Sequence, residues 1–151
     1  MPYSALPHRS QVSLLRSWQL AAAGAVIAVL LQLWGLYRVV GPPRPPWFPF
    51  ADKIEHAVGF AVPVILILLA AALRRPPGWQ WQSSVMTAVV VGLFAAHAIV
   101  SEAIQHVWYR YRTGDLLDVV ADWVGIAAGV MLLRVILLRG PRSGYQGLAA
   151  S

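Results

Sequence analysis

Four apolar segments, each about 20 residues or longer, constrain this 151-residue chain more than any other feature of its sequence. A helix rises about 1.5 Å per residue, so each segment is long enough to cross a hydrocarbon layer about 30 Å thick. Hydrophobic residues make up 58% of the chain and charged residues only 12%, whereas soluble domains carry about 25% charged residues. The sequence therefore predicts an all-α membrane protein with four transmembrane helices in a bundle, at residues 18–40, 54–73, 84–107 and 116–138.

The four segments form one predicted transmembrane domain, residues 18–138, between a cytoplasmic N-terminal segment, 1–17, and a flexible cytoplasmic tail, 139–151. Arginine and lysine residues that remain in the cytoplasm set the orientation of a membrane protein, while acids contribute little. Arginines without neighbouring acids occur near both ends of the chain and after the second segment: Arg9, Arg16, Arg74, Arg75, Arg134, Arg139 and Arg142. We therefore expect a multi-pass protein of the plasma membrane with both termini in the cytoplasm.

The acidic residues are confined to the ends of these segments that this orientation places at the outer face. An ionisable group inside a span costs free energy unless it is paired, hydrated or used, so such groups are candidate functional residues. All six acids of the chain lie there: Asp52, Glu55, Glu102, Asp115, Asp118 and Asp122. The sequence thus predicts a polar cluster near the outer face of the membrane.

Helical spacing places many of these side chains on common faces. Asp52, Glu55 and His56 follow an i, i+3, i+4 pattern at the start of the second segment. Asp115, Asp118 and Asp122 are spaced by three and four residues at the fourth, and their stripe continues through small residues that permit close helix packing, Gly125 and Gly129. Asp52 and Asp115 have a simpler alternative role as helix N-caps.

Together these residues predict an outward-facing polar pocket. Arg110 and Arg112 are expected at its rim, where guanidinium groups suit phosphate or carboxylate. The carboxylates could hold a divalent cation, share a proton or pair with arginine, and the sequence leaves these alternatives open. No cofactor is required. The expected lining is Asp52, Lys53, Glu55, His56, Glu102, Gln105, His106, Arg110, Arg112, Asp115, Asp118 and Asp122.

The composition also excludes several classes of protein. The chain has no cysteine, so it has neither a disulfide framework nor a thiolate nucleophile. It has no P-loop, no G-x-S-x-G elbow and no H-E-x-x-H motif. A net charge of +6 would suit nucleic acid, but the cations punctuate apolar segments and form no patch. Membrane lipids are therefore the expected partners, and nucleic acid is not.

These motifs, in this order, resemble the VanZ-like family of small bacterial membrane proteins over residues 52–129. The family's Asp-Lys-x-x-His motif is matched from Asp52 to His56, and its Glu-x-x-Gln motif by Glu102 and Gln105. Its Arg-x-x-Asp-x-x-Asp motif is matched from Arg112 to Asp118, and its closing motif by Asp122, Gly125 and Gly129. The chain departs from the family at Asp122, where the family usually has asparagine.

The resemblance implies a protein of the bacterial cell envelope, since the founding member of the family is associated with low-level resistance to teicoplanin. It suggests that the chain binds or handles an anionic envelope lipid or lipid-linked cell-wall precursor. One alternative is a membrane-embedded hydrolase or transferase, with Glu102 or Asp118 as general base and His56 or His106 as acid. Another is a structural or assembly protein held by interhelical salt bridges. The residues favour binding over catalysis without deciding between them.

Overall fold

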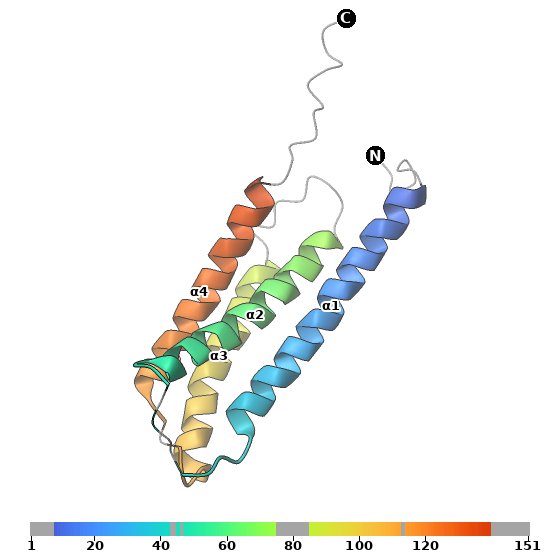
Figure 1. Cartoon of the computed structure of the whole chain (residues 1–151). Coiled ribbons are helices and arrows are strands. Elements are labelled where there is room, and N and C mark those ends of the chain that lie inside the picture. Colours follow the sequence, from blue (N-terminus) through green and yellow to red (C-terminus); the bar gives the residue numbers. More distant parts are fainter. Residues whose placement is uncertain (1–7, 43–44, 46, 75–84, 113, 140–151) are drawn as a thin grey trace, which may run out of the picture.

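The chain folds into four long helices that pack side by side (Figure 1). The structure is a computed structural model, and it describes residues 8–42, 45, 47–74, 85–112 and 114–139. Arg75, Arg142 and the predicted tail beyond residue 139 lie outside the described residues. The helices are α1 His8–Tyr37, α2 Ala51–Leu73, α3 Val85–Trp108 and α4 Leu116–Arg139.

All four helices are long and apolar enough to cross a membrane, so the prediction of four long apolar helices is confirmed. Their candidate spans are Ser17–Tyr37, Ala51–Leu73, Val85–Trp108 and Leu116–Leu137. The surface of the helices is apolar along much of its length, and Leu30, Leu93 and Met131 are among its exposed side chains. A helix face of this kind suits contact with acyl chains, so the chain has the build of a multi-pass membrane protein.

Two helix boundaries differ from the predicted ones. Helix α1 begins at His8, well ahead of the apolar stretch. The limits of a helix are set by its backbone hydrogen bonds and not by the hydropathy of its residues. Helix α2 begins at Ala51, so Asp52 and Lys53 lie in its first turn. Its N-cap is Phe50, with φ of 63°, and the capping role considered for Asp52 is therefore wrong.

Helix α2 is the central element, since it packs extensively against both α1 and α4. Small residues allow α4 to approach it closely. A methyl group added to Gly125 would overlap the backbone of Ala57, and one added to Gly129 would lie 3.0 Å from the carbonyl oxygen of Ala61. The buried core includes Phe60, Val64 and Leu133. This close contact fixes the relative height of side chains on α2 and α4.

The helix directions bring the acids of the chain to one end of the bundle, which we call the acidic end. It comprises the C-terminal ends of α1 and α3 and the N-terminal ends of α2 and α4 (Figure 1). The first turn of α2 is separated by more than 60 residues from the start of α4, yet ion pairs connect them. The opposite end carries the last turn of α2, with exposed Arg74.

Candidate functional site

Seven charged or ionisable side chains from three helices and one loop meet at the acidic end. We call this group the acidic cluster. Helix α2 contributes its first two turns, α3 its last two turns, and α4 its first two turns together with the residue before it. The members of the acidic cluster are Asp52, Lys53, His56, Glu102, Asp115, Asp118 and Asp122.

Lys53 is the cation that holds the start of α2 to the start of α4. Its ammonium Nζ lies 2.6 Å from Asp115 Oδ2, 2.6 Å from Asp118 Oδ1 and 3.1 Å from Asp52 Oδ2. The Lys53 side chain is 18% exposed and that of Asp118 is 13% exposed, so this pair is shielded more than an ordinary surface salt bridge. An ammonium has three donors, and here each is directed to a different carboxylate.

His56 lies deeper on α2 and pairs with the fully buried Asp122 of α4. His56 Nδ1 and Asp122 Oδ1 are 3.0 Å apart, and the Asp122 side chain is 0% exposed. The other ring nitrogen of His56, Nε2, lies 3.9 Å from Asp118 Oδ2. A carboxylate that accepts a hydrogen bond from one imidazole nitrogen selects the tautomer and orients the ring. Asp122 thus positions the free edge of the His56 ring.

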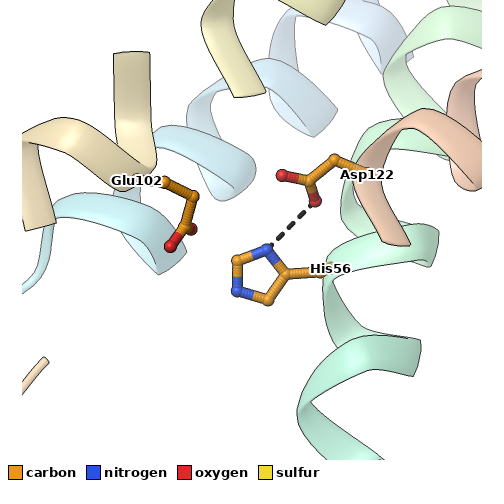
Figure 2. A group of neighbouring side chains, drawn as sticks. All are labelled: His56, Glu102 and Asp122. Atoms are coloured by element: carbon orange, nitrogen blue, oxygen red, sulfur yellow. Dashed lines mark hydrogen bonds and ion pairs between the residues drawn. The ribbon is translucent and has the colours of Figure 1, made fainter. Parts of the chain in front are cut away.

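Glu102 joins α3 to the same site through the loop before α4. Its Oε2 accepts a hydrogen bond of 2.9 Å from the backbone N–H of Asp115. Gly114 makes this approach possible, because a β-carbon there would meet the Glu102 carbonyl oxygen and would lie 3.0 Å from His106 Cβ. Figure 2 shows Glu102, His56 and Asp122 directed toward one another from three different helices.

Asp115 lies just outside the span of α4 and acts as its N-cap. Its Oδ1 accepts a hydrogen bond of 2.9 Å from the backbone N–H of Leu117, as expected for a capping aspartate. The Lys53 ammonium bound at Oδ2 holds the pKa of the Asp115 carboxyl below its usual value, and the Leu117 N–H lowers that pKa further. The capping role predicted as an alternative is therefore present together with the ion pair.

Three of the residues expected in the pocket lie outside the acidic cluster. Glu55, His106 and Arg110 are exposed. The guanidinium of Arg110 lies over the ring of Tyr111, 5.7 Å from its centroid. Glu55 lies outside the acidic cluster because it directly precedes His56, and successive residues of a helix are rotated by about 100° around its axis.

Two further expected pocket residues bind the C-terminal end of α1. Arg112 donates from one guanidinium nitrogen to the Leu36 carbonyl at 2.9 Å and from another to the Gly35 carbonyl at 3.0 Å. Gln105 Nε2 also donates to the Leu36 carbonyl, at 3.3 Å. The last carbonyls of a helix have no partner within the helix, so these side chains satisfy them. A cation here is also favoured by the helix dipole.

The sequence analysis missed several polar contacts made by α1. Tyr109 donates its hydroxyl hydrogen to the Tyr37 carbonyl, and the Tyr37 hydroxyl lies 3.1 Å from His97 Nε2. Gln32 is buried, and its Nε2 has no hydrogen-bond partner among the described residues. Of these residues, only Gln32 could have been singled out from the sequence. It is a polar residue in an otherwise uncharged apolar segment, where a buried amide is expected to need a hydrogen-bond partner.

The deepest part of the acidic cluster has the composition of a metal site. His56, Glu102 and Asp122 each offer one ligand atom, and these atoms all lie within 4.8 Å of one another. Two carboxylate oxygens in this group, Glu102 Oε1 and Asp122 Oδ2, are buried without a hydrogen-bond partner among the described residues. The arrangement can therefore accept a cation or a proton, and His56 can also move one.

Comparison with known proteins adds no relative. The chain matches no protein-family model, no curated protein sequence and no solved structure.

Proposed function

We propose that this chain is a VanZ-like protein of the bacterial plasma membrane that binds the anionic head group of an envelope lipid or lipid-linked cell-wall precursor. The observation that carries the proposal is the convergence of the three motif-bearing segments in one polar cluster at the end of an apolar bundle. A lipid matches this position. Its chains can remain beside the apolar helices while its head group reaches the acidic end.

The contacts that the cations make at the acidic end support one of them as the residue that meets the head group. Arg112 is not available, since both of its terminal guanidinium nitrogens donate to carbonyl groups of α1. Lys53 is surrounded by three carboxylates. Arg110 is exposed in the loop that leads to Asp115, and an exposed guanidinium suits bidentate binding of phosphate. Arg38 is also exposed at this end, but it follows α1 and lies over the ring of Trp34. The proposal therefore assigns first contact with the head group to Arg110, which lies in the loop beside the acidic cluster.

The proposed orientation places the acidic end at the outer face and both termini in the cytoplasm. It is supported by the arginines at the opposite end of the bundle, where α1 begins and α2 and α4 end: Arg9, Arg16, Arg74 and Arg139. The chain has no cysteine, so single cysteines introduced at Trp47 and Arg74 report the two ends separately. A membrane-impermeant thiol reagent applied to intact cells should label the cysteine at 47 and spare that at 74; the reverse pattern would refute the orientation.

The lipid proposal is tested with the full chain in nanodiscs that contain a polyprenyl phosphate, an anionic phospholipid or neutral lipid alone. Native mass spectrometry should detect retained polyprenyl phosphate. Arg110→Gln should weaken its retention at least about tenfold, which corresponds to about 1.4 kcal/mol. Arg74→Gln is the matched control, because it removes an exposed arginine from the opposite end. Equal retention of neutral and anionic lipids by the wild type, or equal losses in the two variants, would refute the proposal.

A membrane-embedded hydrolase or transferase is the second candidate, and the His56–Asp122 pair favours it. An imidazole oriented by a buried carboxylate is a common general base, and Glu102 lies close enough to act with it. This candidate predicts turnover of a polyprenyl phosphate or diphosphate that is lost in His56→Gln and retained in His106→Gln. Absence of turnover by the folded wild type with Mg²⁺, Mn²⁺ and Zn²⁺ would reject it.

A further inference from the structure

We propose that His56, Glu102 and Asp122 bind a divalent transition-metal ion, with Zn²⁺ the best-suited member of that class. The three residues come from α2, α3 and α4, and their ligand atoms lie within 4.8 Å of one another (Figure 2). The inference goes beyond the lipid proposal and does not depend on it, because the site is complete within the chain.

Unpaired oxygen atoms are the independent sign that the group receives a ligand. Glu102 is 5% exposed and Asp122 is 0% exposed. Each keeps one buried oxygen, Oε1 and Oδ2 respectively, without a hydrogen-bond partner among the described residues. A buried carboxylate with unsatisfied oxygens is costly unless a cation or a proton compensates it. Since both oxygens belong to residues that flank His56, a single ion between them would satisfy both.

The geometry fits a small ion after a modest closure of the site. Zn²⁺ binds imidazole nitrogen and carboxylate oxygen at about 2.0–2.2 Å, which places neighbouring ligand atoms about 3.3 Å apart in a tetrahedron. His56 Nδ1 already lies 3.0 Å from Oδ1 of the Asp122 carboxylate, and an ion bound between them would replace this hydrogen bond and release its proton to solvent. Glu102 can offer its unpaired Oε1 to the ion, because its hydrogen bond to the Asp115 N–H is made by the other oxygen, Oε2.

The chemistry of the three ligand residues indicates which ions the site suits and what a bound ion could do. One imidazole and two carboxylates suit Zn²⁺, Mn²⁺ or Fe²⁺, whereas Mg²⁺ and Ca²⁺ prefer sites built from oxygen alone. Three protein ligands leave an open position on a tetrahedral ion, and such a position can accept water or an oxygen of a bound anion. Asp118 Oδ2 lies 3.9 Å from His56 Nε2, the ring nitrogen that is not used as a ligand, and Lys53 holds the other oxygen of Asp118.

The test measures metal binding by the full chain, purified without a polyhistidine tag and reconstituted in nanodiscs of neutral lipid. Metal-stripped protein is dialysed against Zn²⁺ in excess Mg²⁺ and Ca²⁺, and its metal content is measured by mass spectrometry. We expect one Zn²⁺ per chain and a rise in the melting temperature on its addition. Co²⁺ should give visible absorption bands when it replaces Zn²⁺. A folded wild type that binds no stoichiometric Zn²⁺ would overturn the proposal and leave a shared proton as the explanation.

Matched variants locate the ion. Asp122→Asn preserves size and the hydrogen bond to His56, and it should weaken Zn²⁺ binding by about 100-fold or more, since loss of an outer-shell partner alone costs about 10–100-fold. Glu102→Gln should act similarly. Glu55→Gln and His106→Gln remove exposed groups of the same types and should bind Zn²⁺ as the wild type does. If Glu102→Gln fails to fold, Zn²⁺ binding by Asp122→Asn and the shift in the wild-type melting temperature still test the site. Unchanged binding in Asp122→Asn, or equal loss in the controls, would overturn the site.

Discussion

Substitution of Gly125 by alanine should disrupt the packing that builds the acidic cluster. A β-carbon at this position would overlap the carbonyl oxygen, carbonyl carbon and α-carbon of Ala57 on α2. Those are backbone atoms, so no side-chain rotation can relieve the overlap, and α4 must move away from α2. The movement would also lengthen the contacts between His56 and Asp122 and between Lys53 and Asp118, which cross the same interface.

The size of the effect follows from two opposing contributions. Overpacking of a well-packed core costs about 1–3 kcal/mol, and a backbone overlap belongs at the upper end of that range. Alanine is favoured over glycine inside a helix by about 0.5–1 kcal/mol, which offsets part of the cost. The net loss for Gly125→Ala is therefore roughly 2 kcal/mol. Gly129→Ala, with its nearest atom at 3.0 Å, should lose less.

Gly92 on α3 supplies the matched control, because a β-carbon there meets nothing within 4 Å. Reversible unfolding in mixed micelles, driven by increasing SDS fraction and followed by tryptophan fluorescence, measures the free energies. Gly92→Ala should unfold at the same SDS fraction as the wild type or a higher one, and Gly125→Ala at a clearly lower one. If the two variants unfold together, the close approach of α4 to α2 is refuted.

Substitutions at three further positions test contacts of α1 and α4 by the same unfolding measurement. Arg112→Ala should cost about 2–3 kcal/mol, because two charged hydrogen bonds to α1 are lost; Arg112→Lys should recover only part of this, since a single ammonium cannot reproduce the fork. Tyr37→Phe should cost about 1 kcal/mol through its bond to His97. Trp123→Phe should cost about 0.5–1 kcal/mol, because its Nε1 donates to the Ala95 carbonyl at an exposed position. A stability equal to wild type in Arg112→Ala would refute the helix-end role of that arginine.

The four spans could be predicted because hydropathy is a local property of the sequence. A run of about 20 apolar residues has few alternatives to a membrane-spanning helix. The start of α1 at His8 was not predictable on the same basis, because the residues ahead of the apolar run carry no such constraint. The N-cap of α2 was not predictable either, because Phe50 has no side-chain group that can accept a hydrogen bond from the first turn of the helix.

All seven members of the acidic cluster were among the twelve residues expected in the pocket, but the sequence showed neither which five would lie outside it nor how the members pair. Asp118 and Asp122 are four residues apart, and helix geometry alone places residues with this spacing on the same face. Which cation meets that face depends on the rotation of α2 relative to α4, and spacing within either helix carries no information about it. Pairing with arginine was one of the alternatives that the sequence left open, whereas in the structure Lys53 meets the carboxylates and Arg112 binds α1.

The central claim, that the start of α2 and the start of α4 form one cluster, is tested most directly by exchanging the charges of Lys53 and Asp118. Lys53→Asp alone adds a carboxylate beside Asp115 and Asp118, and Asp118→Lys alone places a second ammonium group beside that of Lys53. The double variant restores an ion pair at the contact that now measures 2.6 Å. We predict a favourable coupling of at least about 1 kcal/mol in the double-mutant cycle; single-variant effects that add within about 0.5 kcal/mol would contradict the claim.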